Sequence, residues 1–429
     1  MLNRKQISKL RSSHLGPSLS ISYESPLHIV RGKGQYLFEA NGKRYLDAVN
    51  NIQHVGHCHP VVVKAAQDQY EKLNTNTRYL DEIIVKYAKA LTSRLPKGLD
   101  VCFFTNSGSE ANDLALRIAR SITQSKETIV LDAAYHGNLS SLIQVSPYKH
   151  NGPGGKGPPN FVHIIPRPDI FRGQYRGERV ADDYFAEVNK AIQNIHDKGE
   201  KVSVFMAESL MGCGGQLVLP KGFLKKSFEL TRQVGGLCIA DEVQIGFGRL
   251  GSHFWGFETC DVVPDIITMG KSMGNGHPLS AVVTTKEIAD QFNNGMEYFN
   301  SFGGNPVSCA VGQAVLNVIE NEALQYNSYK VGTYLLDQLK IIDHPLIGDV
   351  RGKGLFIGIE LVKNSNLLTP AADEANSIVN YMKDSGILIS ADGPDHNVLK
   401  IKPPIIFTHE NADELVYNLK LIINQYFSK

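Results

Sequence analysis

The sequence predicts an α/β protein with a mainly parallel central sheet in a large domain and a smaller α+β domain built from both chain ends. Short apolar runs alternate with longer helical patterns through the middle of the chain. Several of these runs are almost continuous Val, Ile, Leu and Phe, which is typical of strands buried on both faces of a parallel sheet. The two ends of the chain lack this alternation, so we expect them to form a second unit.

The candidate strands of the central sheet are residues 101–105, 128–132, 161–165, 202–208, 236–243, 265–271 and 279–285. We assign them to a large domain of residues 49–310. The small domain then combines residues 1–48, which are turn-rich, with residues 311–429, which begin with helical patterns and add strands at 355–362 and 387–390. The Gly- and Pro-rich residues 151–160 are predicted to form a surface loop.

Composition excludes several classes of protein. The 429 residues are 42% apolar and 20% charged, which is ordinary for a folded chain. With 44 basic and 43 acidic residues the net charge is +1, so charge gives no reason to expect nucleic acid or a membrane as a partner. No uncharged apolar stretch reaches the roughly 20 residues of a membrane helix. Six cysteines without a CxxC pair predict reduced thiols and a cytoplasmic protein.

The N-terminal segment is basic and contains several serines, with no acidic residue before Glu24. This composition is weakly similar to that of a transit peptide. We favour the simpler interpretation, a basic arm of the folded protein.

A candidate anion site follows the strand at 101–105. Asn106, Ser107, Gly108 and Ser109 form a tight loop, and apolar residues then recur at helical spacing. Glycine allows close approach of a ligand, and the free N–H groups of a helix N-terminus suit a phosphate. Taken alone, this pattern is better explained by a plain capped helix, because such turns are common. The formal GxGxxG at residues 152–157 is rejected, because prolines interrupt it and no helix opens after it.

Two further strands end in chemically useful side chains. Asp241 closes the apolar run at 236–243, and Lys271 closes the run at 265–271. Open α/β sheets bind their ligands at the carboxyl ends of strands. A partly desolvated lysine is a nucleophile toward an aldehyde, and a nearby acid can pair with a pyridinium nitrogen. A surface lysine and a structural salt bridge are the alternatives, but the phosphate site, lysine and acid together indicate pyridoxal phosphate.

The segments CIADEVQIG at 238–246 and PDIITMGK at 264–271 resemble the signature of the class III pyridoxal-phosphate aminotransferases. Four more segments match that family: HVGHCHP at 54–60, SGSEA at 107–111, YHG at 135–137 and SFGGNP at 301–306. The resemblance covers nearly the whole chain. It implies fold type I, pyridoxal 5′-phosphate as cofactor, and a homodimer or homotetramer with sites shared between subunits.

The resemblance also implies roles for individual residues. Lys271 resembles the lysine that forms the Schiff base, and Asp241 resembles the acid that keeps the ring nitrogen protonated. Gly108 and Ser109 resemble the phosphate ligands, and Tyr135 and Val243 the residues on the two faces of the ring. Gln244 resembles the residue near the ring hydroxyl. Ser301 stands where the family usually has threonine, and the resemblance implies that it binds the phosphate across the dimer interface.

Three closely spaced histidines, His54, His57 and His59, invite a metal site. No fourth ligand is evident in the sequence, so we favour a structural role and predict no metal.

The chain departs from the family where many members carry a glutamate–arginine pair for α-carboxylates. Cys213 stands in place of the glutamate and Lys400 in place of the arginine. A lysine suits phosphate better than bidentate carboxylate recognition. An ordinary amino-acid transamination cycle is therefore in doubt.

One branch of the family, the ethanolamine-phosphate and 5-phosphohydroxylysine phospho-lyases, resembles this chain more closely. Segments similar to that branch include LNTNTRY at 73–79, GNGHP at 274–278 and SADGPDHNVLKIKPP at 390–404. We therefore predict a phospho-lyase acting on a small phosphorylated amine, most readily ethanolamine phosphate, with Arg78 and Lys400 as candidate ligands of the substrate phosphate. The alternatives are an ω-aminotransferase, a lyase for an aminophosphonate, and a catalytically silent homologue that serves as a binding protein.

Overall fold

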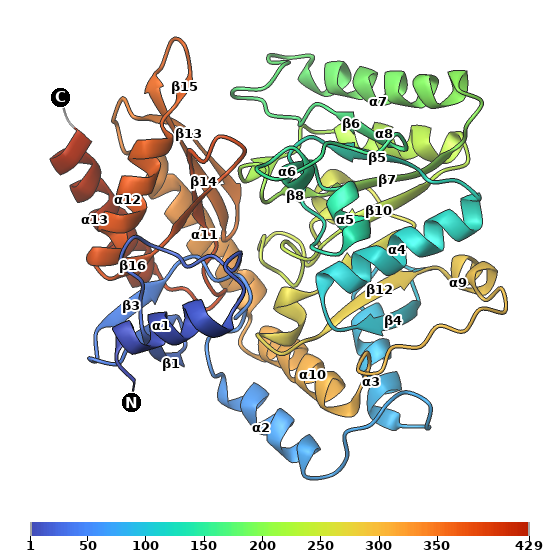
Figure 1. The fold of residues 1–429 in the computed structure, drawn as a ribbon, viewed down its shortest axis with the longest axis horizontal. Coiled ribbons are helices and arrows are strands. Elements are labelled where there is room, and N and C mark those ends of the chain that lie inside the picture. Colours follow the sequence, from blue (N-terminus) through green and yellow to red (C-terminus); the bar gives the residue numbers. More distant parts are fainter. Residues whose placement is uncertain (1, 428–429) are drawn as a thin grey trace.

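A seven-stranded sheet forms the centre of the larger lobe in the computed structural model, which describes residues 2–427 (Figure 1). Its strand order is β4-β12-β11-β10-β7-β5-β6, and only β12 runs antiparallel to its neighbours. Each predicted strand is present, within two residues at either end. The strands are β4 (Val101–Thr105), β5 (Glu127–Leu131), β6 (Val162–Ile165), β7 (Val202–Glu208), β10 (Leu237–Asp241), β11 (Ile266–Met269) and β12 (Ser280–Thr284).

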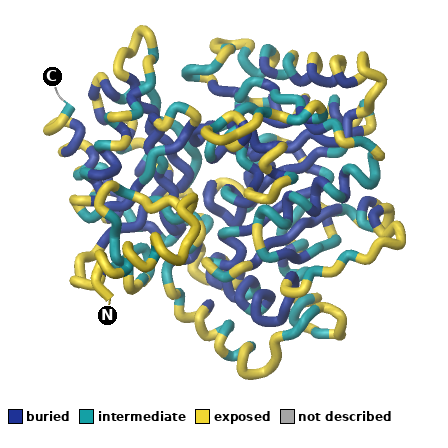
Figure 2. Tube along the Cα trace, in the orientation of Figure 1, coloured by how far each residue is buried: buried dark blue, intermediate teal, exposed yellow. Residues whose placement is uncertain are grey.

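Helices cover both faces of this sheet, which explains the continuous apolar runs. Helix α4 (Gly108–Thr123) packs on one face, where Ile239 of β10 belongs to its apolar cluster. Helices α7 (Val180–Asp197) and α8 (Phe223–Gln233) pack on the other face, to which the neighbouring Ala240 points. Figure 2 shows the central strands buried and the outer loops exposed. The α/β class with a mainly parallel sheet is therefore confirmed.

The smaller lobe joins the two chain ends. Strand β16 (Ile387–Leu388) pairs in parallel with β3 (Arg44–Asp47), so the C-terminal part completes the N-terminal sheet. The other strands of this lobe are β1 (Ile29–Lys33), β2 (Tyr36–Glu39), β13 (Ile347–Lys353), β14 (Phe356–Asn364), β15 (Thr369–Pro370), β17 (Ser390–Asp392) and β18 (Val398–Ile401). Its helices are α1 (Arg4–His14), α11 (Leu324–Lys340), α12 (Ala372–Asp384) and α13 (His409–Phe427). The domain boundaries at residues 48 and 310 stay a prediction.

The basic N-terminal segment forms helix α1 on the surface of the smaller lobe (Figure 1). Asn3 caps it, and Arg4 pairs with the buried Glu39 at 2.7 Å. Residues 151–160 form turns and coil, as predicted. None of the helices within residues 2–427 is long and apolar enough to cross a membrane.

The remaining helices complete the large lobe and its lower edge in Figure 1. Helix α10 contacts both α2 and α3. The loops that precede α3 and α10 carry several exposed apolar side chains, with Leu80 and Phe302 among them. The bounds are α2 (Pro60–Tyr70), α3 (Glu82–Thr92), α5 (Ser140–Gln144), α6 (Pro147–His150), α9 (Lys286–Phe292) and α10 (Pro306–Asn321), with the short strands β8 (Leu210–Met211) and β9 (Leu217–Val218).

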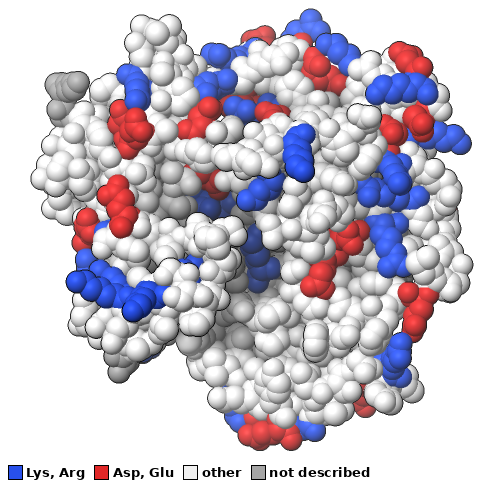
Figure 3. All heavy atoms as spheres, in the orientation of Figure 1, with Lys and Arg blue, Asp and Glu red and all other residues white. Residues whose placement is uncertain are grey.

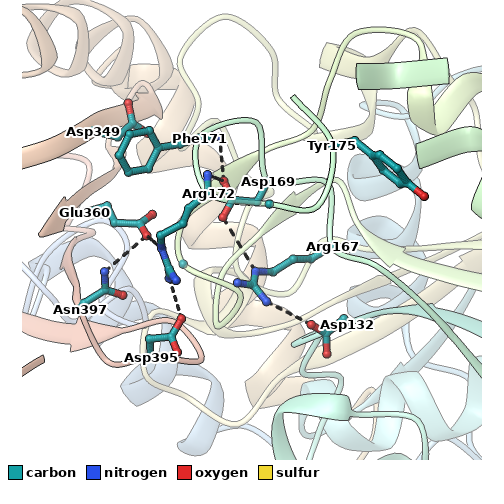
Figure 4. A network of polar contacts seen from close by, with 12 residues as sticks. Asp132, Arg167, Asp169, Phe171, Arg172, Tyr175, Asp349, Glu360, Asp395 and Asn397 are labelled. Atoms are coloured by element: carbon teal, nitrogen blue, oxygen red, sulfur yellow. Dashed lines mark hydrogen bonds and ion pairs between the residues drawn. The ribbon is translucent and has the colours of Figure 1, made fainter. Parts of the chain in front are cut away.

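An ionic network ties the two lobes together (Figure 4). Arg172, from the loop after β6, bonds Glu360 of β14 at 2.7 Å and Asp395 at 2.6 Å. Asn397 also donates to Glu360, at 3.4 Å. These contacts hold the loop between β17 and β18 at the boundary between the lobes. Figure 3 shows a hollow at this boundary, with basic side-chain atoms inside it.

Candidate active site

The carboxyl ends of the central strands enclose a cavity of about 390 Å³. Parallel strands present their carboxyl ends at one edge of the sheet, which brings together side chains distant in sequence. Three of the predicted residues, Arg78, Ser301 and Lys400, do not line this cavity in the chain described. The other seven do: Gly108, Ser109, Tyr135, Asp241, Val243, Gln244 and Lys271.

Lys271 lies two residues after the end of β11 and lines the cavity. Its backbone adopts the left-handed region with φ of 38°, which is unusual for a residue with a side chain. Burial lowers the pKa of its ammonium, although the negative charge of Asp241 acts in the opposite direction. A lysine held in this way is closer to the neutral amine that attacks a carbonyl.

Asp241, at the end of β10, is buried and held by three donors. Its Oδ2 accepts hydrogen bonds from Asn112 Nδ2 and His136 Nδ1, both at 2.8 Å. Its Oδ1 accepts from the backbone N–H of Val243 at 3.1 Å. The carboxylate is thus fixed in place while it faces the cavity. Sequence reasoning missed Asn112 and His136 as supports, although both lie in or beside segments that match the family.

The N-terminus of α4 lies beside Gly270, the residue before Lys271, and lines the same cavity. Ser107 caps the helix, and a Cβ on Gly270 would lie 3.3 Å from the backbone nitrogen of Gly108. A Cβ on Gly108 itself would lie 2.7 Å from Cγ1 of Val243, so only glycine fits here without displacing that side chain. The first N–H groups of a helix have no partner within the helix and favour an anion.

The residues of this cavity fit pyridoxal phosphate. The helix N-terminus can hold a phosphate, Lys271 can react with an aldehyde, and Asp241 can hold a proton on a ring nitrogen. Tyr135 and Val243 supply cavity walls for a flat ring, and Tyr135 is itself packed edge-on against Tyr148 with centroids 6.0 Å apart.

Glu208 was missed by sequence reasoning as a site residue. It ends β7, pairs in register with Asp241, and lines the same cavity. Gly212 donates its backbone N–H to Oε2 at 2.9 Å, whereas Oε1 has no hydrogen-bond partner among the described residues. Burial and the adjacent charge of Asp241 raise the pKa of Glu208 to about 7. Two neighbouring buried carboxyl groups favour a protonated Glu208, because Asp241 has more donors.

We expect Glu208→Gln to stabilise the cofactor-free protein above neutral pH. The pKa of Glu208 is higher in the folded than in the unfolded protein, so its ionisation destabilises the fold. This destabilisation is absent below the unfolded-state pKa and complete above the folded-state pKa. At about pH 8 the variant should gain about 3 kcal/mol in unfolding free energy, and at about pH 4 nothing. Urea unfolding at both pH values measures this difference. An equal gain at both values would contradict a titrating Glu208.

Three predicted residues lie outside the cavity. Ser301 is exposed, and Arg78 is 58% exposed, paired with Glu297 at 3.1 Å and stacked 4.2 Å from the ring centroid of Phe299. Lys400 lies 3.3 Å from Asp392 and lines a neighbouring cavity of about 690 Å³.

The two cavities adjoin. Asn51 lines the second cavity and donates a hydrogen bond at 3.0 Å to Gln244, which lines the first. Cys213 also lines the second cavity, and burial raises the pKa of its thiol to about 12. The second cavity therefore presents one basic side chain and an uncharged thiol at the positions where the family often has arginine and glutamate.

The three histidines have separate partners. Nε2 of His54 bonds the backbone oxygen of Phe247 at 2.6 Å, His57 bonds Asp47 at 2.7 Å, and His59 bonds Glu322 at 3.0 Å. Their contacts are those of structural side chains.

Comparison with known proteins finds similar chains named as aminotransferases and as phospho-lyases. A family model described as aminotransferase class-III matches residues 20–423. The alanine–glyoxylate aminotransferase 2-like protein of Drosophila melanogaster is 49% identical and covers 98% of this chain and 87% of its own length. Ethanolamine-phosphate phospho-lyase homolog 1 of Caenorhabditis elegans is 41% identical, with 98% and 94% covered. A solved phospholyase from Arthrobacter in complex with phosphoethanolamine superimposes with a TM-score of 0.93 at 40% identity, covering 98% of this chain and 99% of that chain.

Proposed function

The chain belongs to the class III aminotransferase family, whose cofactor is pyridoxal 5′-phosphate, and within that family we propose that it is a phospho-lyase for a small phosphorylated amine, with ethanolamine phosphate preferred. The observation that carries this proposal is the second cavity. It offers Lys400 and the neutral Cys213 in place of an arginine–glutamate pair. A single lysine suits a phosphate better than an α-carboxylate.

When bound, pyridoxal phosphate supplies an aldehyde for the substrate amine and a ring that accepts an electron pair. Asp241 would hold the proton on the ring nitrogen, and the helix N-terminus at Gly108 would hold the cofactor phosphate. Lys271, buried at the cavity edge, takes the proton from the carbon that bears the amine. The C–O bond to phosphate then breaks and phosphate leaves with the bonding electrons. With one water consumed, ethanolamine phosphate gives acetaldehyde, ammonia and phosphate.

The proposal is tested by product formation without an amino acceptor. Purified enzyme with cofactor and ethanolamine phosphate should release phosphate and acetaldehyde in equal amounts when no keto acid is added. Alanine with glyoxylate should react slowly by comparison. Fast amino transfer without phosphate release would establish the runner-up, an aminotransferase, which the 49% identity to an alanine–glyoxylate aminotransferase 2-like protein favours.

We expect Lys400→Ala to raise KM for ethanolamine phosphate more than it lowers kcat. Losing one charged contact to a desolvated phosphate costs about 1.5–3 kcal/mol, or roughly tenfold to a hundredfold in kcat/KM. Asp392→Asn frees Lys400 from its partner and should move KM the other way. An unchanged KM in both variants would remove Lys400 from the substrate site.

We also propose that the enzyme is at least a homodimer. Arg78 and Ser301 lie on a surface with exposed apolar side chains, Leu80, Phe299 and Phe302 among them. Exposed apolar side chains of this kind, where they form a patch, mark an interface. In a dimer, Arg78 and Ser301 could then serve the partner's cavity, as the resemblance implies for Ser301. The six free cysteines are consistent with the proposed cytoplasmic location.

A further inference from the structure

Lys402 is a buried lysine to which the proposed reaction gives no role. It follows β18 directly, and its exposed fraction is 0%. Its ammonium lies 4.1 Å from the ring centroid of Phe356. Within residues 2–427, no carboxylate oxygen approaches its Nζ to 4.0 Å or less. A buried ammonium without a counter-ion is costly, so this arrangement calls for a function.

The surroundings of Lys402 carry both signs of charge. Burial and the positive charge of Lys400 lower the pKa of Lys402 to about 7, and Asp392, Cys213 and Glu208 act in the opposite direction. Charged groups that line both cavities therefore act on Lys402, whose ammonium bonds Gln244 of the first.

Gln244 is the one side chain that accepts a hydrogen bond from the Lys402 ammonium in the described chain, at 3.0 Å. The same oxygen, Oε1, accepts a second bond from Asn51 Nδ2, also at 3.0 Å. The charged form of Lys402 can only donate, and Nδ2 of Asn51 donates to the same atom, so the atom that faces both is the amide oxygen. Both lone pairs of Oε1 are occupied, and the amide NH₂ remains as the group that Gln244 can offer to a ligand in the cavity.

We propose that Lys402 is a positioning residue that holds Gln244 as a hydrogen-bond donor toward the first cavity, where the donor stabilises negative charge on a ligand oxygen. The inference rests on the proposed place of Gln244 near the ring hydroxyl of the cofactor. It does not depend on which substrate the enzyme uses. Asn51 shares the task, but Lys402 adds a positive charge behind the amide, which strengthens the donor.

The test uses the visible absorption of the cofactor-loaded enzyme as a function of pH. Lys402→Met keeps the volume of the side chain but removes the charge and the donor, and Gln244 is then free to turn over. The deprotonated form of the bound chromophore loses stabilisation, so its transition should move up by about one pH unit. Lys383→Met, at a buried lysine on α12, is the matched control and should leave the transition in place.

A double variant separates positioning from a general effect on the fold. In the Gln244→Ala background, Lys402→Met should add no further shift, because the two residues act as one unit. The inference would be overturned if the pH shifts of the two single variants added in the double variant. It would also be overturned if Gln244→Ala moved the transition and Lys402→Met did not. An unchanged transition in Gln244→Ala would instead refute the proposed place of Gln244, and the inference with it. Should Lys402→Met fail to fold, Lys402→Gln gives the same comparison with a smaller expected shift.

Discussion

Replacing Lys271 with alanine should abolish release of phosphate from ethanolamine phosphate, with a loss in kcat of at least about 10³-fold. In the proposed reaction the buried amine of Lys271 is the base at the reacting carbon, and Asp241, the charge that acts on it most strongly, is already held by three donors. No other lysine lines the first cavity within residues 2–427, so no second amine stands ready to replace it.

The cofactor should still bind to this variant through its phosphate, because the helix N-terminus at Gly108 and the carboxylate of Asp241 are unchanged. Borohydride treatment of the wild-type enzyme should attach the cofactor covalently to Lys271, which peptide mass spectrometry detects. Lys286→Ala, at an exposed lysine paired with Asp290, is the control and should keep both labelling and turnover. Labelling at another lysine would contradict the assignment.

The central site could be predicted because strand ends fix it. The runs that end in Asp241 and Lys271 form the neighbouring strands β10 and β11, and the loop at Gly108 follows β4, which β12 separates from β11 in the same sheet. Strand order and direction then place these ends together, whatever the details of the side chains. The predicted strands agree with the observed ones because burial on both faces of the sheet leaves a strong apolar signal in the sequence.

The supports of the site could not be predicted in the same way. Asn112 lies on α4 and His136 in a loop, and only the packing of α4 on the sheet brings both to Asp241. Glu208 has no local feature that distinguishes it from any other acid at a strand end. Its raised pKa arises from its position in register with Asp241.

Lys400 illustrates how register decides a contact. In the β17–β18 hairpin, Ser390 lies opposite Lys400, and Asp392 lies opposite Val398. The diagonal neighbours Lys400 and Asp392 therefore meet at 3.3 Å, which a linear reading of residues 390–404 does not reveal. Two residues further on, Lys402 leaves the strand and turns to Gln244 instead. One short segment thus places Lys400 in the second cavity and Lys402 against Gln244.

Asp241→Ala should lower kcat about 10²–10³-fold while the fold is retained, because a ring without a protonated nitrogen is a poor acceptor of electrons. Loss of one charge-assisted contact, worth about 1.5–3 kcal/mol, should also weaken cofactor binding roughly tenfold to a hundredfold. Circular dichroism of the variant checks its fold, and equilibrium dialysis of the cofactor measures its affinity.

A cofactor methylated at the ring nitrogen gives the decisive comparison. It carries a permanent positive charge and needs no proton there, and the shortened side chain at position 241 leaves room for the methyl group. It should therefore restore part of the turnover of Asp241→Ala and none of that of Lys271→Ala. Failure of rescue with normal binding would mean that Asp241 acts through the geometry of Asn112 and His136 and not through the ring proton. Unchanged turnover in Asp241→Ala with the natural cofactor would transfer the proton-holding role to Glu208, the adjacent acid in the same cavity.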